Sequence, residues 1–526
     1  MIIKPQRLLG EGLIASAEKY PGKTAVISGD KEYTYRQFLE EAMAMAYALV
    51  SRGLNKGDRV AIYLENSWTE ARAIYAVSLA GGVFVAINPQ TKADKLQYIL
   101  NDSGARILIA ESRLKRELDI ASKNLNVLER IIWHGEEIPT LAASPEAEKM
   151  DDLLVERTRK ENLPNIIPND LAALIYTSGS TGFPKGVMMT HQSMVFATWS
   201  LIEYLRLDPQ EKIMLVLPMS FDYGLYQLFM AITVGATLII EKSFIFLGSI
   251  YKQIEKTQPT VFPGVPTIFA MMVSSYKRAP FSFESIKKIT NTAAALSTAY
   301  IPYLKKIFPN ALIFKMYGLT ECKRVSYLEP ELIDEKPGSV GKAIPGTEVF
   351  ILSQEGKEVP PGHPGILYVR GPHVMTGYWN QPELSREMLK PGKLPGERIL
   401  CTNDLFRMDE EGFLYFVGRN DDIIKTRGEK VSPLEVEHVI NKIDEVKESA
   451  VIGVPDDIMG QIVVAYIAAE KGANITEKEV QFFCSRHLES FMIPQKIIFR
   501  DTLPKSANGK IDKRVLLKQY SEDEKQ

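Results

Sequence analysis

The chain has 526 residues, of which 45% are hydrophobic and 24% are charged, and its formal net charge at pH 7 is -2. This composition is typical of a globular protein with a large core, and the length indicates more than one domain. The balanced charge gives no basic field of the kind that binds nucleic acid or anionic membranes. Cys322, Cys401 and Cys484 match neither a disulfide framework nor a metal-ligand spacing. We see no signal-peptide pattern and no membrane-spanning run, and we therefore expect a cytoplasmic protein.

Helix and strand patterns alternate along the first part of the chain. The predicted helices are 34–52, 68–79 and 94–101, and the predicted strands are 59–64, 82–87 and 105–109. Such alternation predicts a mainly parallel sheet that helices cover on both faces. Residues 136–163 are polar and irregular, and we expect a surface excursion there.

The alternation resumes after residue 190 and gives way to other patterns near residue 340. The predicted helices are 191–205, 225–234, 250–256 and 265–274, and the predicted strands are 212–217, 236–240, 259–262 and 287–290. Short alternating runs between Gly and Pro turns then predict an antiparallel β-rich lobe. A final segment has the size of a small α+β domain, with helices 433–440 and 477–487 and strands 448–454, 462–469 and 495–499. We therefore predict an α/β protein with a large N-terminal domain, a β-rich lobe and a small C-terminal domain.

Residues 176–187, Tyr-Thr-Ser-Gly-Ser-Thr-Gly-Phe-Pro-Lys-Gly-Val, join two apolar runs that are short enough to be buried strands. The glycines allow positive φ, so that backbone N–H groups can surround an anion, and the hydroxyls and Lys185 add further donors. The stretch is not a Walker A loop, because Gly186 follows the lysine where that motif has Ser or Thr. A flexible Ser/Gly linker is the alternative. We interpret the stretch as a phosphate-binding loop.

This run resembles the signature loop of the AMP-forming adenylating enzymes, which include acyl-CoA synthetases, luciferases and the adenylation domains of nonribosomal peptide synthesis. The resemblance covers essentially the whole chain, with motifs in the family's order. It implies an N-terminal adenylation domain at 1–420 and a mobile C-terminal domain at 421–526, with a hinge at Asp421. It also implies a catalytic role for Lys185. The loop residues that it implies in ATP or AMP binding are Thr177, Ser178, Gly179, Ser180, Thr181 and Gly182.

A second motif, Tyr317-Gly318-Leu319-Thr320-Glu321-Cys322, follows an apolar run. A strand end that carries these side chains suits a nucleotide site at the carboxyl edge of an α/β sheet, although an ordinary strand-to-loop turn is the alternative. Tyr317 could stack on a base, Thr320 could hold a phosphate, and Glu321 could hold Mg2+. The motif matches the family's second signature.

Three further segments resemble family positions that contact the nucleotide. Thr292, Ala293 and Ala294 stand where the family's backbone lines the adenine, and many members have glycine first. Asp404 matches the ribose-binding aspartate, with Asn403 in place of the usual glycine. Arg419 matches the ribose-binding arginine. Taken alone, the run around Arg419 is also compatible with a charged surface turn.

Near the C-terminus, Asn508-Gly509 predicts a turn that presents Lys510 at its tip. By composition alone Lys510 is one more exposed lysine. In the family this lysine bridges the substrate carboxylate and the α-phosphate, where a cation is needed because two anions must meet. The loop with Gly428 resembles the one used in thioester formation. The resemblance implies that the small domain rotates about Asp421 between the two steps.

Asp222, in Phe221-Asp222-Tyr223-Gly224, bears on the substrate. In peptide-synthesis adenylation domains an aspartate at this point pairs with the α-ammonium of an amino acid, and a buried carboxylate needs such a cation. The alternative is that Asp222 caps a helix that begins near Leu225. By resemblance, the residues that line a rather small pocket are Asp222, Tyr223, Tyr226, Asn291, Met316 and Val325.

We therefore predict an acid–thiol ligase that uses ATP and Mg2+, activates a small amino acid such as proline with release of pyrophosphate, and transfers it to the phosphopantetheine thiol of a separate carrier protein. The alternative is an AMP-forming acyl-CoA synthetase that acts on a fatty or aryl acid with coenzyme A. A noncatalytic nucleotide-binding relative and a luciferase-type enzyme with another acceptor are further alternatives. We expect no nucleic-acid partner.

Overall fold

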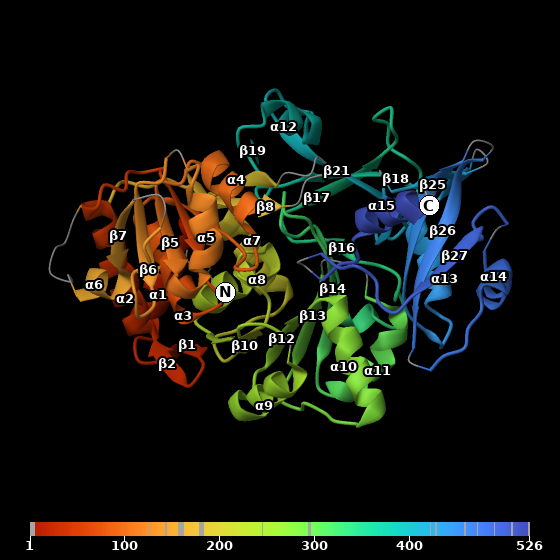
Figure 1. The fold of residues 1–526 in the computed structure, drawn as a ribbon, viewed down its shortest axis with the longest axis horizontal. Helices are drawn as coiled ribbons and strands as arrows, with labels where there is room; N and C mark the ends of the chain where they lie inside the picture. The colour runs from red at the N-terminus through yellow and green to blue at the C-terminus, as the bar shows by residue number, and fades with distance from the viewer. Residues whose placement is uncertain are drawn as a thin grey trace.

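A computed structural model describes residues 6–125, 127–141, 145–155, 162–177, 184–244, 246–292, 296–420, 422–426, 429–456, 459–470, 472–488, 490–506 and 509–523. Figure 1 shows a large N-terminal part with helix-covered sheets, a β-rich lobe above it, and a small C-terminal part at the other end of the molecule. The mixed α/β architecture with a small C-terminal unit is the one that the sequence predicts.

The first large sheet is mainly parallel and contains the two strands that flank the phosphate loop. Its order is β19 (Gly377–Tyr378), β9 (Lys185–Thr190), β8 (Leu171–Thr177), β4 (Val83–Ala86), β3 (Arg59–Tyr63), β5 (Ile107–Glu111), β6 (Arg130–His134) and β7 (Glu146–Lys149). From β8 to β7 every neighbouring pair is parallel, whereas β9 runs antiparallel to both β8 and β19. Every residue of β4 is buried, as expected of a strand that is covered on both faces.

The second large sheet has a parallel centre and antiparallel edges. Its order is β16 (Lys342–Ala343), β15 (Ser326–Leu328), β14 (Leu312–Tyr317), β13 (Lys288–Asn291), β12 (Val261–Gly264), β10 (Lys212–Leu215), β11 (Thr237–Ile240), β1 (Thr24–Ser28) and β2 (Lys31–Thr34). One continuous apolar cluster includes residues of both large sheets and of the helices between them.

Helices connect and cover these strands. They are α1 (Leu9–Lys19), α2 (Tyr35–Ser51), α3 (Trp68–Leu79), α4 (Ala93–Ser103), α5 (Lys115–Ser122), α6 (Met150–Val155), α7 (His191–Tyr204), α8 (Asp222–Val234), α9 (Leu247–Thr257), α10 (Pro266–Arg278) and α11 (Ile301–Ile307). α2 shows why the sequence folds in this way: the Thr34 side chain accepts a hydrogen bond from Gln37 N (3.2 Å), and Thr34 N donates to Gln37 Oε1 (2.8 Å). This capping box starts the helix, and the apolar stripe through Phe38 and Ala42 is fully buried.

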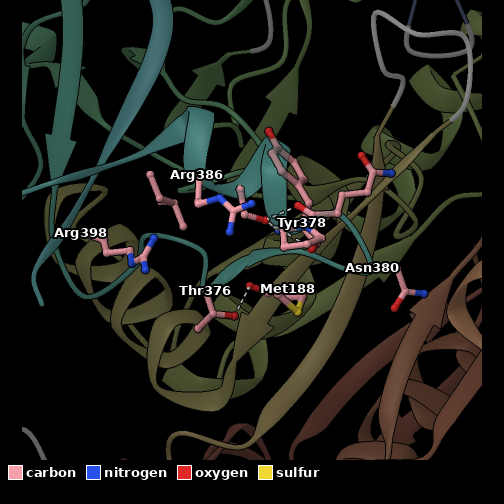
Figure 2. A pocket seen from close by; sticks show the side chains of 10 residues that line it. Met188, Thr376, Tyr378, Asn380, Arg386 and Arg398 are labelled. Carbon is pink, nitrogen blue, oxygen red and sulfur yellow. Dashed lines mark hydrogen bonds between the residues drawn. The ribbon is translucent and has the colours of Figure 1, made fainter.

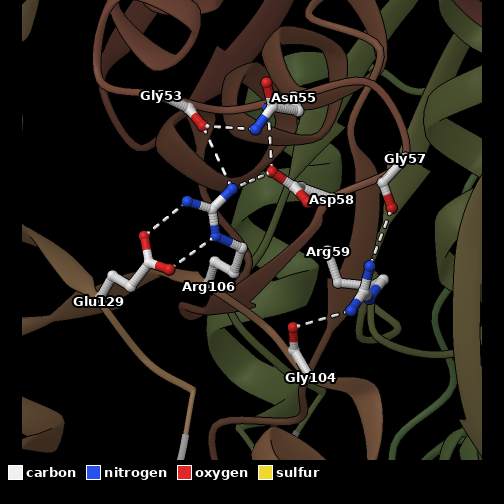
Figure 3. A network of polar contacts seen from close by, with 8 residues as sticks. All are labelled: Gly53, Asn55, Gly57, Asp58, Arg59, Gly104, Arg106 and Glu129. Carbon is white, nitrogen blue, oxygen red and sulfur yellow. Dashed lines mark hydrogen bonds and ion pairs between the residues drawn. The ribbon is translucent and has the colours of Figure 1, made fainter.

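A polar network joins the amino ends of neighbouring parallel strands in the first sheet (Figure 3). Arg106, which precedes β5, donates to both carboxylate oxygens of Glu129 and pairs with Asp58. Arg59, the first residue of β3, donates to the backbone oxygen of Gly104 (3.1 Å). These arginines connect neighbouring strands at the amino edge of the sheet. In open α/β sheets ligands bind at the opposite, carboxyl edge.

The β-rich lobe and the C-terminal unit follow in sequence. The lobe contains β17 (Glu348–Leu352), β18 (Gly365–Arg370), β20 (Leu389–Pro391), β21 (Arg398–Met408), β22 (Leu414–Arg419) and α12 (Pro382–Met388), and its paired strands are antiparallel. The C-terminal elements are β23 (Ile424–Thr426), β24 (Glu429–Val431), α13 (Pro433–Ile440), β25 (Val446–Asp456), β26 (Gly460–Ala469), α14 (Glu477–Ser485), β27 (Lys496–Arg500) and α15 (Lys513–Asp523).

Two local expectations are wrong. Residues 136–163 are not wholly irregular, because β7 adds to the free edge of β6 and α6 follows it directly. Asp222 is not the cap of a helix that begins near Leu225: α8 begins at Asp222 itself, and Phe221 holds the cap position. No helix within the described ranges is long and apolar enough to cross a membrane.

Candidate active site

The predicted phosphate loop joins β8 to β9, and Thr177 stands opposite Lys185 in the antiparallel register. The strand–loop–strand arrangement expected for this stretch is therefore present. Ser178, Gly179, Ser180, Thr181 and Gly182 lie outside the described residues.

The second motif leaves the carboxyl end of β14 and returns at once as β15. Tyr317 O accepts a hydrogen bond from Val325 N (2.9 Å), which closes this loop at its base. At Gly318 an added Cβ would lie 2.1 Å from the backbone oxygen of Lys323, so only glycine fits there. Lys323 itself has φ 65°, in the left-handed region. The loop is thus tightly folded, and the positions of Lys323 and Arg324 are fixed relative to Tyr317.

The predicted ribose-binding residues come together at the lobe. Asp404 Oδ1 lies 2.9 Å from Arg419 Nε, and the Tyr317 hydroxyl donates a hydrogen bond to Asp404 Oδ2 (2.5 Å). Burial raises the pKa of Asp404, and the nearby Arg419 and Tyr317 act in the opposite direction. Asn403 has φ 57°, so it adopts the left-handed conformation that favours glycine. Asn403, which stands where the family usually has glycine, therefore keeps the backbone turn before Asp404.

Glu321 and Lys185 are connected through a residue that the sequence did not single out. The Tyr378 hydroxyl donates to Glu321 Oε1 (2.6 Å), and Lys185 Nζ lies 5.3 Å from the centre of the Tyr378 ring. Within the described part of the chain, no group of three or more His, Cys, Asp or Glu could hold a metal. Glu321 as a lone carboxylate is compatible with Mg2+, which takes most of its ligands from water and phosphate.

Lys510 belongs to a turn that docks on the N-terminal part. Gly509 has φ 74° and donates from its N–H to Ser506 O (2.9 Å), and its carbonyl accepts from Thr267 Oγ1 (3.3 Å). The Lys510 side chain keeps an exposed surface, yet it is surrounded by enough protein for desolvation to lower its pKa. The Asp404 carboxylate opposes this shift, and Arg419 adds to it. The structure therefore brings Lys510 near Asp404 and Arg419, the two residues predicted to bind the ribose.

The residues predicted to line the acyl pocket are buried, and they lie around an ion pair. Lys323 Nζ lies 2.8 Å from Asp222 Oδ1, and the lysine side chain is 0% exposed. The Tyr223 hydroxyl hydrogen-bonds with Thr290, whereas the buried Tyr226 hydroxyl has no partner among the described residues. The other predicted lining residues are equally buried: Asn291, Met316 and Val325.

The remaining predicted positions are less informative. Thr292 is buried, and its hydroxyl has no hydrogen-bond partner within the described ranges. Thr320 accepts a hydrogen bond at its backbone oxygen from Lys323 Nζ (2.9 Å). The positions that lie outside the described residues are Ala293, Ala294, Asp421 and Gly428.

A hollow of about 410 Å³ lies where β9, β19 and α12 meet (Figure 2). Arg386 and Arg398 line it together with apolar side chains such as Met188, and Arg386 pairs with Glu383 (2.8 Å). None of the site residues predicted from the sequence lines this hollow. It shares Tyr378 with the site, since this residue lines the hollow and its hydroxyl donates to Glu321.

Comparisons with known proteins agree with this geometry. Residues 13–379 match the AMP-binding enzyme family, and residues 435–510 match the AMP-binding enzyme C-terminal domain. The chain is 32% identical to the long-chain-fatty-acid–CoA ligase of Bacillus subtilis, covering 99% of this chain and 96% of that protein. It is also 28% identical to a linear gramicidin synthase of Brevibacillus parabrevis, covering 95% of this chain but only 9% of that protein.

Solved structures extend the likeness to the whole chain. The anthranilate CoA ligase AuaEII in complex with anthranoyl-AMP is 27% identical, with a TM-score of 0.89 and coverage of 98% of both chains. ATP-bound MatB from Rhodopseudomonas palustris is 28% identical, with a TM-score of 0.85 and coverage of 98% of this chain and 99% of that chain. The chain therefore belongs to the AMP-binding enzyme family, the AMP-forming adenylating enzymes, and is an AMP-forming acid–thiol ligase.

Proposed function

We propose that the protein is an AMP-forming acyl-CoA synthetase, which adenylates a carboxylic acid with ATP and passes the acyl group to the thiol of coenzyme A. The observation that carries this proposal is the pairing of Asp222 with Lys323, because an internal cation already neutralises the carboxylate that an amino-acid substrate would need. The relatives named as CoA ligases, aligned over nearly their full length, support the same acceptor.

In the first step the substrate carboxylate attacks the α-phosphorus of ATP and pyrophosphate leaves. Asp404 would hold the ribose hydroxyls, with Arg419 beside it, and Lys510 would lie between the two reacting anions. Lys185 and the phosphate loop would bind the phosphates. Glu321 would hold Mg2+, which neutralises phosphate charge when it is bound.

In the second step the thiol attacks the acyl carbonyl and AMP leaves. We propose that the C-terminal unit first rotates about Asp421, removing Lys510 and bringing in the loop that contains Gly428. Asp421→Pro, which restrains φ at this position, should leave adenylation intact and lower thioester formation. Equal retention of both steps in single-turnover assays would contradict the rotation.

The acceptor is tested by incubating the protein with ATP, Mg2+ and panels of carboxylic acids, including amino acids, with either coenzyme A or phosphopantetheinylated carrier proteins. We expect acyl-CoA and AMP in equal amounts with non-amino acids, measured by mass spectrometry. Thioester formation only with an amino acid and only on a carrier protein would instead support prolyl-type activation. The free, buried state of all three cysteines is compatible with our expectation of a cytoplasmic enzyme.

A further inference from the structure

Two cationic residues contact the predicted acyl-pocket residues Asp222 and Tyr223, and they bring more positive than negative charge to this region. Lys323 and Arg324 are adjacent in sequence and both are buried, with residue exposures of 0% and 4%. Within the described part of the chain, only Lys323 of the two pairs with a carboxylate, that of Asp222. Among the described residues, no carboxylate lies within ion-pair distance of the Arg324 guanidinium. The cluster of Asp222, Lys323 and Arg324 therefore carries one uncompensated positive charge.

The contacts of Arg324 leave part of its hydrogen-bonding capacity unused. Its Nη1 donates to the backbone oxygen of Lys323 (2.7 Å), and its guanidinium carbon lies 4.9 Å from the centre of the Tyr223 ring. Its Nε is buried and has no hydrogen-bond partner in the part of the chain that the structure describes. A buried cation without an anion is costly, and a guanidinium presents its donors as a planar fork that matches a carboxylate.

Arg324 lies beside a residue predicted to line the acyl pocket and not beside the residues predicted to bind the nucleotide. Its guanidinium lies against Tyr223, on α8, whereas the nucleotide-binding pair of Asp404 and Arg419 lies at the lobe. The Tyr226 hydroxyl, one turn further along α8, is also buried and has no partner among the residues described. Tyr226 is a predicted lining residue, and Arg324 lies against another one, Tyr223. Their two unsatisfied donors indicate a ligand with acceptor oxygens at this point.

We propose that Arg324 determines specificity by binding a second carboxylate of the substrate, so that the acids activated by this enzyme are dicarboxylic. One carboxylate enters the reaction with ATP, and the other forms an ion pair with Arg324 and accepts a hydrogen bond from Tyr226. The Asp222–Lys323 pair is the remaining polar part of this wall. A plain hydrocarbon chain beside it would leave the donors of Arg324 and Tyr226 without acceptors. This inference rests on the proposed function, and it names the substrate class.

The test compares acids of equal length that differ only in the second carboxylate: butanoate with succinate, hexanoate with adipate, and octanoate with suberate. ATP–pyrophosphate exchange is the readout, because it reports adenylation without any thiol. We expect wild-type kcat/KM to favour the dicarboxylate by about tenfold or more at one or more lengths. In Arg324→Met this preference should fall by about 30-fold or more, the usual effect of removing one partner of a buried charge pair, whereas Arg324→Lys should retain part of it.

Arg206→Met is the matched control, since Arg206 pairs with Glu329 and Glu331 at the surface and should leave the ratio unchanged. A wild type that prefers the monocarboxylate at every length, or a ratio unchanged by Arg324→Met, would contradict the inference. The wild-type comparison decides this even if Arg324→Met fails to fold. Exchange with monocarboxylates alone would leave the proposed function standing, whereas no exchange with any acid would contradict both.

Discussion

Lys323 Nζ lies 2.8 Å from Asp222 Oδ1, and this ion pair joins a loop after β14 to the first residue of α8. The sequence predicts that Asp222 binds the ammonium group of an amino-acid substrate. In the structure a lysine of the chain itself, Lys323, pairs with this carboxylate. An amino acid would have to displace Lys323, which has no solvent exposure and also donates to Thr320 O. The pair therefore favours an acid without an α-ammonium group.

Lys323→Met should destabilise the protein, because it leaves the Asp222 carboxylate buried without its cation. We expect the free energy of unfolding to fall by about 3–5 kcal/mol, measured by guanidinium denaturation. Lys305→Met, which breaks the exposed pair with Asp334, should cost less than about 1 kcal/mol. Adding Asp222→Asn to Lys323→Met should recover part of the loss. Similar stabilities for both single variants would show that the buried pair contributes little.

Gly318→Ala should disturb the site through the backbone. The new Cβ would meet the Lys323 carbonyl at 2.1 Å, so the loop that carries Lys323 and Arg324 must move. We expect a stability loss of about 1–3 kcal/mol and weaker binding of acid substrates, measured by thermal denaturation and calorimetry. Gly22→Ala, where an added Cβ meets nothing within 4 Å, is the control. Unchanged acid binding in Gly318→Ala would argue against a rigid loop.

Local signals in the sequence predict much of this fold. The Thr34 cap and the apolar stripe after it place α2 correctly to within a residue at each end. The apolar runs around the phosphate loop predict β8 and β9, and the family motifs place Asp404 beside Arg419. These features depend on neighbours in the chain or on a recognisable motif.

The features that were not predicted depend on distant contacts. β7 has the sequence Glu-Ala-Glu-Lys, which has no strand character of its own, and it forms because the edge of β6 offers backbone partners. The Asp222–Lys323 pair spans 101 residues, and the Tyr378–Glu321 hydrogen bond spans 57. Nothing near either residue in the sequence signals such a partner.

Glu70→Gln should stabilise the protein at neutral pH. Glu70 on α3 is buried, and its Oε2 has no hydrogen-bond partner among the described residues. Desolvation, with a smaller effect of Glu111, raises the pKa of Glu70 to about 8. Between the ordinary glutamate pKa and pH 8, the unfolded chain ionises while the folded protein stays protonated, so folding stability falls as pH rises. We expect Glu70→Gln to gain about 3 kcal/mol at pH 7 and nothing at pH 4.5.

The measurement for Glu70 is guanidinium denaturation at a series of pH values, with the exposed Glu18→Gln as the control. His191 and His373 have the opposite effect on folding stability: they lower it as the pH falls, whereas Glu70 lowers it as the pH rises. Burial lowers the pKa of each to about 4, so the stability they contribute is complete above pH 6.5 and is lost as pH falls toward 4. A Glu70→Gln gain that is the same at pH 4.5 and pH 7 would show that Glu70 does not change its charge on unfolding.

Lys510→Ala should separate the two half-reactions. In the structure Lys510 lies with Asp404 and Arg419, and only the attack on ATP brings two anions together there. We expect pyrophosphate exchange to fall by about 100- to 1000-fold, as when one preorganised donor is removed from a site of developing charge. Thioester formation from supplied acyl-adenylate should be retained, because the carboxylate is then already joined to the α-phosphate as a mixed anhydride and the two anions no longer have to meet. Lys505→Ala, at the base of the same turn and paired with Glu448 (2.8 Å), should leave both half-reactions intact. If Lys510→Ala lowers both half-reactions equally, Lys510 supports the structure of the site and does not act on the first step.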